Sequence, residues 1–196
     1  MTMLTFEPLN GPAISTVLDD VARLRITVFR DFPYLYDGTL AYERDYLARF
    51  AASDGAVVVV ARHGGKIVGA ATGCPLSAEH DEFKAPFIAR GFDIATIFYC
   101  AESVLLPAYR GQGAGHRFFD LREEQGRKLG ARHATFCAVM RPVDHPARPK
   151  DYAPLDPFWR KRGYEPVAGL TTEFSWRDIG HNNDTLKPMQ FWMRDL

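Results

Sequence analysis

The chain has 196 residues, a length that suits one domain built around a single hydrophobic core. Lysine plus arginine and aspartate plus glutamate both number 24, so the formal net charge is zero. Because proteins that grip nucleic acid carry a basic excess or stripe, this balance argues against nucleic acid as a partner. A net charge near zero gives little repulsion between copies, and a possible homodimer is compatible with it.

The cysteines and the apolar pattern indicate a reduced, cytoplasmic protein. Cys74, Cys100 and Cys137 are an odd number in apolar runs, which predicts buried thiols rather than a disulfide framework. The first ten residues lack the pattern of a signal peptide, and no window approaches the ~20 apolar residues of a membrane span, so no membrane partner is expected. The histidines show no metal-ligand spacing, which predicts no metal site.

The first half of the chain predicts a short strand, two helices and a β-hairpin. Residues 4–6 alternate as in a strand. A helix from residue 13 onward is marked by apolar residues at helical spacing: Val17, Val21, Leu24 and Val28. A second helix is expected over residues 40–51. Two strands are expected at 56–62 and 66–74, joined by a His-Gly-Gly turn.

The second half predicts alternating helices and strands with no repeat or linker. The expected elements are a helix at 82–90, one long strand at 94–106, a helix at 114–129, a strand at 133–139, a short helix at 157–162, and closing strands at 170–176 and 189–193. Residues 140–156 are rich in proline and charge and predict a long loop. The chain is therefore expected to form one domain over residues 1–196.

The chemistry is concentrated where the long strand meets the following helix, in the sequence Arg-Gly-Gln-Gly-Ala-Gly at residues 110–115. Alternate glycines let a backbone turn tightly and approach a ligand closely. The first amides of a helix lack internal acceptors and lie at its positive end. The segment therefore predicts a binding site for phosphate oxygens, with Arg110 as a fixed cation beside it.

Two other known phosphate-binding patterns do not match the sequence. The Walker pattern requires Gly-Lys-Ser/Thr, and no such triplet occurs. The dinucleotide fingerprint would start at Gly111 and Gly113, but His116 stands where its third glycine is required. The acidic residue expected ~20 positions later is also missing.

The segment resembles instead the signature of the GNAT superfamily of acyl-CoA-dependent N-acyltransferases, Q/R-x-x-G-x-G/A after a strand. The string Val-Leu-Leu-Pro at 104–107 and the later Phe-Trp-Arg-Lys-Arg-Gly-Tyr at 158–164 are also typical of it. The order of elements matches over almost the whole chain. The resemblance implies an α/β (α+β) fold, with a central mixed, mostly antiparallel sheet that is splayed at its fourth strand and flanked by helices.

The resemblance also implies an N-acetyltransferase that moves the acetyl group of acetyl-CoA, its co-substrate, to the primary amine of a small molecule by direct attack. The amides of the turn would hold the pyrophosphate, and the strand before it would pair with the pantetheine arm, splaying after Val104. The implied cofactor-binding residues are Val104, Leu105, Leu106, Arg110, Gly111, Gln112, Gly113, Ala114, Gly115 and His116. Aromatic residues at 29–42 would line the acceptor site, or half of them would belong to the ordinary core.

Glu102 and Tyr152 are the catalytic candidates. Glu102 is the only acid in the long strand, so it is interpreted either as a base, direct or through water, or as a structural carboxylate. Trp159 stands where the family usually has a proton-donating tyrosine, and an indole does not release its proton. Tyr152 is the preferred replacement, with Tyr109 or water as alternatives; it could equally be a packing residue.

Three further interpretations stay open. The basic loop residues Arg141, His145, Arg148 and Lys150 either bind an anionic group or are simply solvated. Instead of a small-molecule enzyme, the chain could be an acyl-CoA-binding sensor or interaction module without turnover, an alternative that Trp159 favours. Acetylation of protein lysines or N-termini would require an open acceptor groove.

Overall fold

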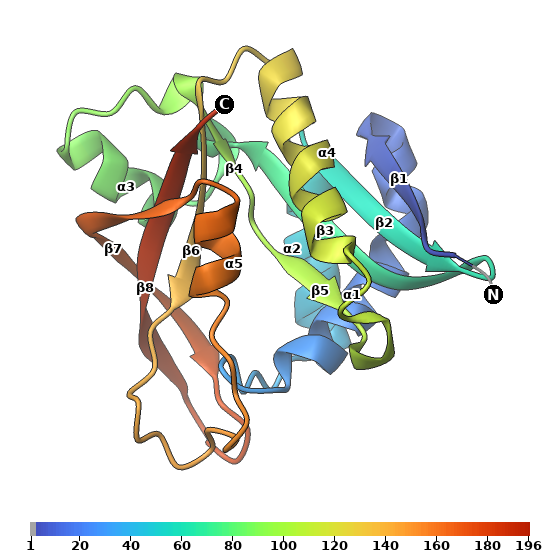
Figure 1. The fold of residues 1–196 in the computed structure, drawn as a ribbon, viewed down its shortest axis with the longest axis vertical. Helices are drawn as coiled ribbons and strands as arrows, with labels where there is room; N and C mark the ends of the chain where they lie inside the picture. The colour runs from blue at the N-terminus through green and yellow to red at the C-terminus, as the bar shows by residue number, and fades with distance from the viewer. Residues whose placement is uncertain (1–2) are drawn as a thin grey trace.

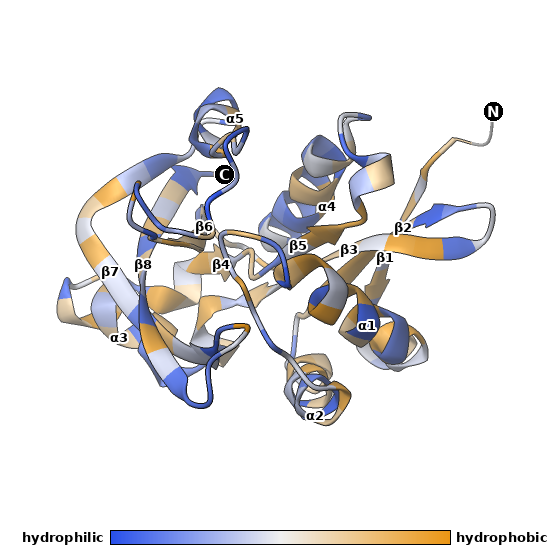
Figure 2. Ribbon diagram, turned by 90° about the horizontal axis from the view of Figure 1, so that it is seen from below, coloured by the Kyte–Doolittle hydropathy of each residue, from blue (hydrophilic) through white to orange (hydrophobic). Residues whose placement is uncertain are grey.

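The computed structural model describes residues 3–196, which form an eight-stranded sheet with helices on both faces (Figures 1 and 2). The strands are β1 (Thr5–Asn10), β2 (Val57–His63), β3 (Lys66–Pro75), β4 (Ile97–Tyr99), β5 (Ser103–Leu105), β6 (His133–Val139), β7 (Glu165–Arg177) and β8 (Asp184–Asp195). Their order is β1-β2-β3-β4-β6-β8-β7, and β5 also pairs with β3. Only the β4–β6 pair is parallel among these strands, which confirms the mixed, mostly antiparallel sheet.

The α-helices are α1 (Leu18–Phe29), α2 (Leu40–Ala51), α3 (Asp81–Ala89), α4 (Ala114–Lys128) and α5 (Asp156–Lys161). Short 3₁₀ turns are η1 (Gly11–Val17), η2 (Leu76–Ala78), η3 (Ile94–Thr96) and η4 (Pro107–Tyr109). The helix expected from residue 13 is therefore divided, since η1 precedes α1. The bounds of α2 are as predicted, and the Thr39 hydroxyl caps it by accepting the Tyr42 amide at 3.3 Å.

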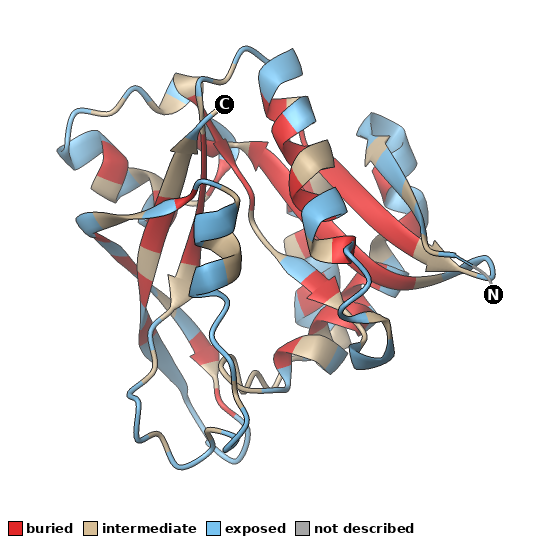
Figure 3. Cartoon of the chain, viewed as in Figure 1, coloured by how far each residue is buried: buried red, intermediate tan, exposed pale blue. Residues whose placement is uncertain are grey.

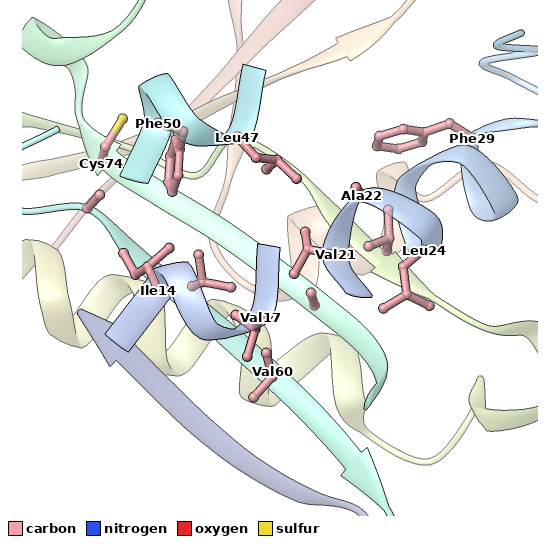
Figure 4. Packing of buried hydrophobic residues seen from close by; sticks show 14 residues of the cluster. Ile14, Val17, Val21, Ala22, Leu24, Phe29, Leu47, Phe50, Val60 and Cys74 are labelled. Carbon is pink, nitrogen blue, oxygen red and sulfur yellow. The ribbon is translucent and has the colours of Figure 1, made fainter. Parts of the chain in front are cut away.

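The β2–β3 hairpin forms as predicted, and its consecutive valines are explained by helices on both sides of the sheet. Gly64 and Gly65 have φ of 56° and 80°, which suits the tight turn. Val58 and Val60 pack under α1 and α2, as Figure 4 shows for Val60. Val57 and Val59 face the opposite side with α4 residues. Because both faces are covered, these strands are the most continuously buried part of the sheet (Figure 3).

The prediction of one continuous strand over residues 94–106 is wrong. The segment is divided into η3, β4 and β5 by a β-bulge: three steps along β3, from Cys74 to Ala71, match four steps from Tyr99 to Ser103. The last bond between β4 and β6 on this side joins the Cys100 amide to the Thr135 carbonyl at 2.7 Å. The strands therefore diverge after Cys100, four residues earlier than expected.

The closing hairpin is longer than predicted, since β7 and β8 extend beyond 170–176 and 189–193 in both directions. Its β7 strand packs against α3. In the described part of the chain, no helix combines the length and the apolar character needed to cross a bilayer.

Candidate functional site

The glycine-rich turn leads from η4 into α4. Gly111 and Gly113 have φ of 76° and 81°, a left-handed conformation that favours glycine, and Gly113 is the N-cap of α4. A Cβ added to either would meet no atom within 4 Å, so both positions border open space. The amides of residues 112–115 have no hydrogen-bond partner among residues 3–196. The turn therefore presents unpaired N–H groups at the positive end of a fifteen-residue helix.

Gly115 and His116, the last two residues predicted to bind the pyrophosphate, have contacts with other parts of the protein. A Cβ on Gly115 would lie 3.1 Å from Cζ of Phe158, so this glycine allows α5 to pack closely on α4. The His116 amide donates to the Gly113 carbonyl at 3.0 Å, and its ring lies 4.9 Å from that of Phe158. The structure thus leaves the amides before His116 available to a ligand. Packing of α5 on the turn was not visible from the sequence spacing.

The charged side chain at the turn reaches back along β5. Arg110 donates from Nε to the Leu105 carbonyl at 3.4 Å, and its side chain is about half exposed, 52%. Asp31 approaches the same guanidinium at 3.9 Å. Tyr109 is turned toward the β2–β3 hairpin, with its hydroxyl 3.5 Å from Nδ1 of His63. Arg110 therefore contributes a positive charge between β5 and the free amides.

The two strands that diverge have backbone edges on the same gap that no neighbouring strand pairs with, although Arg110 donates to the Leu105 carbonyl there. The Leu106 amide bonds to Val68 and the Glu102 carbonyl accepts from Thr72, so even-numbered peptide groups of β5 face β3. Since peptide groups alternate along a strand, those of Ser103 and Leu105 face away from β3. The Thr135 carbonyl, which bonds Cys100, shows that odd-numbered groups of β6 face the other side of the gap. Val104 and Leu106, predicted to contact a cofactor, direct their backbone groups to β3.

Glu102 lies at the bulge and is ion-paired. Its Oε1 accepts from Arg25 of α1, which also donates to Glu43 of α2. The Glu102 side chain is 10% exposed, and its Oε2 has no hydrogen bond to a described residue. Glu102 is therefore held by an ion pair through one carboxylate oxygen, and its second carboxylate oxygen remains available. Arg25 comes from a distant helix and carried no sequence signal for this role.

Trp159 and Tyr152 lie in different surroundings. The Trp159 ring packs against Phe136 and Trp192, with centroids 4.9 and 5.1 Å away, and it is partly buried against the core. Tyr152 lies edge-on to Phe32 at 4.7 Å, and the Arg148 guanidinium is 4.8 Å from its centroid. Burial raises the pKa of Tyr152, so the phenol keeps its proton at neutral pH. Tyr152 thus packs, from the long loop, against the segment that follows α1.

Arg141 holds the segment between α1 and α2 in place. It donates to the carbonyls of Pro33 and Tyr34, both at 2.8 Å, and forms a two-point ion pair with Asp178 at 2.8 and 2.9 Å. Lys187 approaches the same carboxylate at 3.2 Å. These contacts engage the guanidinium fully with protein groups. Neither interpretation of Arg141 from the sequence, ligand binding or a solvated loop, anticipated this role.

The three cysteines are free and buried, as predicted. Burial raises the pKa of Cys74 and Cys100, and raises that of Cys137 to about 12. Cys137 contacts the Tyr99 hydroxyl at 3.1 Å. The thiols therefore stay protonated at neutral pH.

Several solved structures with the same fold carry the name acetyltransferase. A ribosomal-protein-alanine N-acetyltransferase from Brucella melitensis superimposes with a TM-score of 0.62 at 15% identity, covering 98% of this chain and 99% of its own. A putative acetyltransferase from Acinetobacter baylyi gives 0.65 at 12%, covering 100% and 93%. A putative acetyltransferase from Salmonella typhimurium, solved with its cofactor acetyl-CoA, gives 0.63 at 12%, covering 98% and 94%. No curated protein sequence matches the chain.

The sequence profile of the acetyltransferase (GNAT) family matches residues 21–150, from α1 through the long loop. This span contains the bulge, the diverging strands and the glycine-rich turn. The profile and the eight-stranded fold agree with each other and with the free amides at the head of α4. The chain therefore belongs to the GNAT family of acetyltransferases, whose acetyl donor is acetyl-CoA.

Proposed function

We propose that the chain transfers an acetyl group from acetyl-CoA to the primary amine of a small molecule, by direct attack of the amine on the thioester. The observation that carries the proposal is the set of free amides at residues 112–115, which follow the edge of β5 that faces away from β3. Helix-terminal amides suit a pyrophosphate. A strand edge suits the amides of a pantetheine arm, and the alternation of β5 assigns this role to Ser103 and Leu105.

The acceptor amine needs a proton acceptor and the thiolate needs a proton. The proposal assigns the free Oε2 of Glu102 to the amine, directly or through water, and the protonated phenol of Tyr152 to the departing sulfur. Acetyl-CoA supplies the activated acetyl group when it is bound. The Arg141–Asp178 ion pair supports a small acceptor, because it fixes the segment after α1 and leaves less freedom to admit a peptide.

The pyrophosphate-binding role of the free amides is tested by Gly113→Ala, with Gly130→Ala as its matched control. Both glycines have left-handed φ, 81° and 79°, and open space around the added methyl group, and they flank opposite ends of α4. Each substitution is expected to cost about 1 kcal/mol of stability through backbone strain. Only Gly113→Ala places a methyl group at the free amides, so it should weaken coenzyme A binding about tenfold or more in calorimetry. Equal affinities in the two variants would contradict the assignment.

A binding module without turnover is the second candidate function, and Trp159 favours it. Its packing against Phe136 and Trp192 leaves no proton donor at the position where the family usually has a tyrosine. The two functions are separated by measuring thiol release from acetyl-CoA with a panel of small amines. Turnover supports the enzyme, whereas coenzyme binding without thiol release from any amine supports the module.

A further inference from the structure

Ser103 is the first residue of β5, and it lies where this strand separates from β6. One edge of the residue is paired with Ala71 of β3. Its own peptide group faces away from β3, into the gap between β5 and β6. The strand therefore places Ser103 next to Glu102 and the bulge, at the end of β5 that is further from the glycine-rich turn.

The Ser103 hydroxyl accepts a hydrogen bond from a buried cation. Arg122 of α4 is 1% exposed, and its Nη2 donates to Ser103 Oγ at 3.0 Å. A guanidinium has no acceptor, so the serine oxygen must accept in this contact and its proton is left for another partner. That proton has no acceptor among residues 3–196. Because the oxygen is bonded to a cation, the hydroxyl is polarised and its proton is a better donor.

The uncovered part of Ser103 faces the gap. On the α4 side, Phe119 packs against Phe136 of β6 with ring centroids 5.7 Å apart, and the Arg122 guanidinium lies 4.7 Å from the Phe119 centroid. The same helix thus contacts both diverging strands. Ser103 is exposed even though β3 pairs with one edge of it and Arg122 contacts its side chain. The exposed surface of Ser103 therefore belongs to the gap between β5 and β6.

The proposed path of acetyl-CoA brings its thioester to this serine. With the pyrophosphate at the amides of residues 112–115, the pantetheine arm runs back along β5 past Leu105. The thioester, at the far end of that arm, then lies beside Ser103 and Glu102, where the strands have diverged. Attack by an amine places negative charge on the carbonyl oxygen, which requires a hydrogen-bond donor. The roles given to Glu102 and Tyr152 leave that donor unassigned.

We propose that the Ser103 hydroxyl donates a hydrogen bond to the carbonyl oxygen of the bound thioester. As the amine nitrogen bonds to the carbonyl carbon, the π electrons of the C=O bond move to this oxygen, and the hydrogen bond stabilises their charge. The C–S bond then breaks, the amine proton passes to Glu102, and the thiolate takes the proton of Tyr152. The Ser103 proton stays on its own oxygen. The catalytic part of this assignment rests on the proposed function, whereas the hydrogen bond requires only that acetyl-CoA binds along β5.

The hydrogen bond is tested by infrared difference spectroscopy of acetyl-CoA that carries an isotope label at its carbonyl carbon, bound without an acceptor amine. A hydrogen bond lowers the carbonyl stretching frequency, so the band should lie at higher frequency in Ser103→Ala than in wild type. Ser103→Thr keeps a hydroxyl and should restore the wild-type position. Ser175→Ala, at an exposed serine of β7, is the matched control and should leave the band unchanged. Thermal unfolding checks that each variant is folded.

Turnover of an amine gives the second measurement. Ser103→Ala should lower kcat about 10²-fold, as expected for loss of one donor to a developing oxyanion, with little change in KM for acetyl-CoA. Ser103→Thr should recover most of the loss, and Ser175→Ala should behave as wild type.

A carbonyl band and a kcat equal to those of wild type in Ser103→Ala would overturn the inference, while the turnover itself would still support the proposed function. Weaker acetyl-CoA binding with an unchanged band would give Ser103 a structural role only, and would also overturn it. A band that depends on Ser103, in a protein that acetylates no amine, would support the hydrogen bond and overturn the proposed function.

Discussion

At the level of single residues, one guanidinium serves two buried carboxylates. Arg25 donates to both Glu43 and Glu102, and Glu43 is 0% exposed with its Oε1 lacking a hydrogen-bond partner. The cluster therefore carries one more negative than positive charge in its ion pairs. A buried ion pair is costly to assemble, but it is much more costly to lose its only cation. Arg25 thus keeps Glu102 in position at the bulge.

Arg25→Met is expected to destabilise the protein by about 3–5 kcal/mol, because it leaves two buried carboxylates without a cation. Arg23→Met, an exposed position on the same helix, should change stability by less than about 0.5 kcal/mol. Urea unfolding monitored by circular dichroism measures both. Adding Glu43→Gln to Arg25→Met should restore part of the loss. An Arg25→Met variant as stable as wild type would contradict the role given to Arg25.

At the level of elements, the bulge depends on an arginine from α4. Arg122 is 1% exposed and donates to the carbonyls of Thr72 and Glu102, both at 3.1 Å, and to the Ser103 hydroxyl at 3.0 Å. The two carbonyls also accept backbone amides, from Ala101 and Thr72 respectively, so Arg122 gives each of them a second hydrogen bond. The divergence of β5 from β6 is therefore stabilised by one side chain from α4, on the α4 face of the sheet.

Arg122→Met should remove the charged hydrogen bonds that the guanidinium donates at the bulge and cost about 1.5–3 kcal/mol, because the two carbonyls keep their backbone partners. Hydrogen exchange gives a local measurement. In the Arg122→Met variant, the exchange rates of the Thr72 and Leu106 amides should increase over wild type more than those of the β1 amides. Arg127→Met, an exposed position on the same helix, is the control. Unchanged exchange at Thr72 would show that the bulge does not depend on Arg122.

Elements with a local signal were predictable from the sequence. The α2 helix, the β2–β3 hairpin and the α4 helix follow from periodicity and glycine placement within their own residues. The break at residues 100–102 was not predictable, because its apolar pattern indicates one strand and the side chain that bonds to it, Arg122, comes from another element. The glycine-rich turn was likewise predicted from its own residues. The partner of Glu102 was not, since Arg25 lies 77 positions away.

At the level of the whole molecule, the Arg141–Asp178–Lys187 cluster joins the segment after α1 to the C-terminal hairpin. Tyr36 and Asp178 also form a β-bridge there. Burial alone would raise the pKa of Asp178, but hydrogen bonds from Arg141 and Lys187 outweigh it and lower the pKa below its ordinary value of 3.8. The cluster thus stabilises the folded chain while Asp178 is ionised.

The pH dependence follows from the sign of this shift. A carboxylate with a lowered folded-state pKa contributes stability above its unfolded pKa, and that contribution is lost as the pH falls through the folded value. The difference in unfolding free energy between wild type and Asp178→Asn should therefore be largest above about pH 5 and shrink below about pH 3. Asp54→Asn, at an exposed position, should show no such trend. A constant difference across this range would contradict the assignment.

The burial of all three cysteines has a consequence for an enzyme whose reaction releases a free thiol. Coenzyme A without its acetyl group can exchange with oxidised partners and attach to accessible protein sulfur through a mixed disulfide. That exchange requires a thiolate within reach of solvent, and Cys74, Cys100 and Cys137 are each no more than 6% exposed with their pKa raised by burial. The folded protein is therefore protected from modification by its own product.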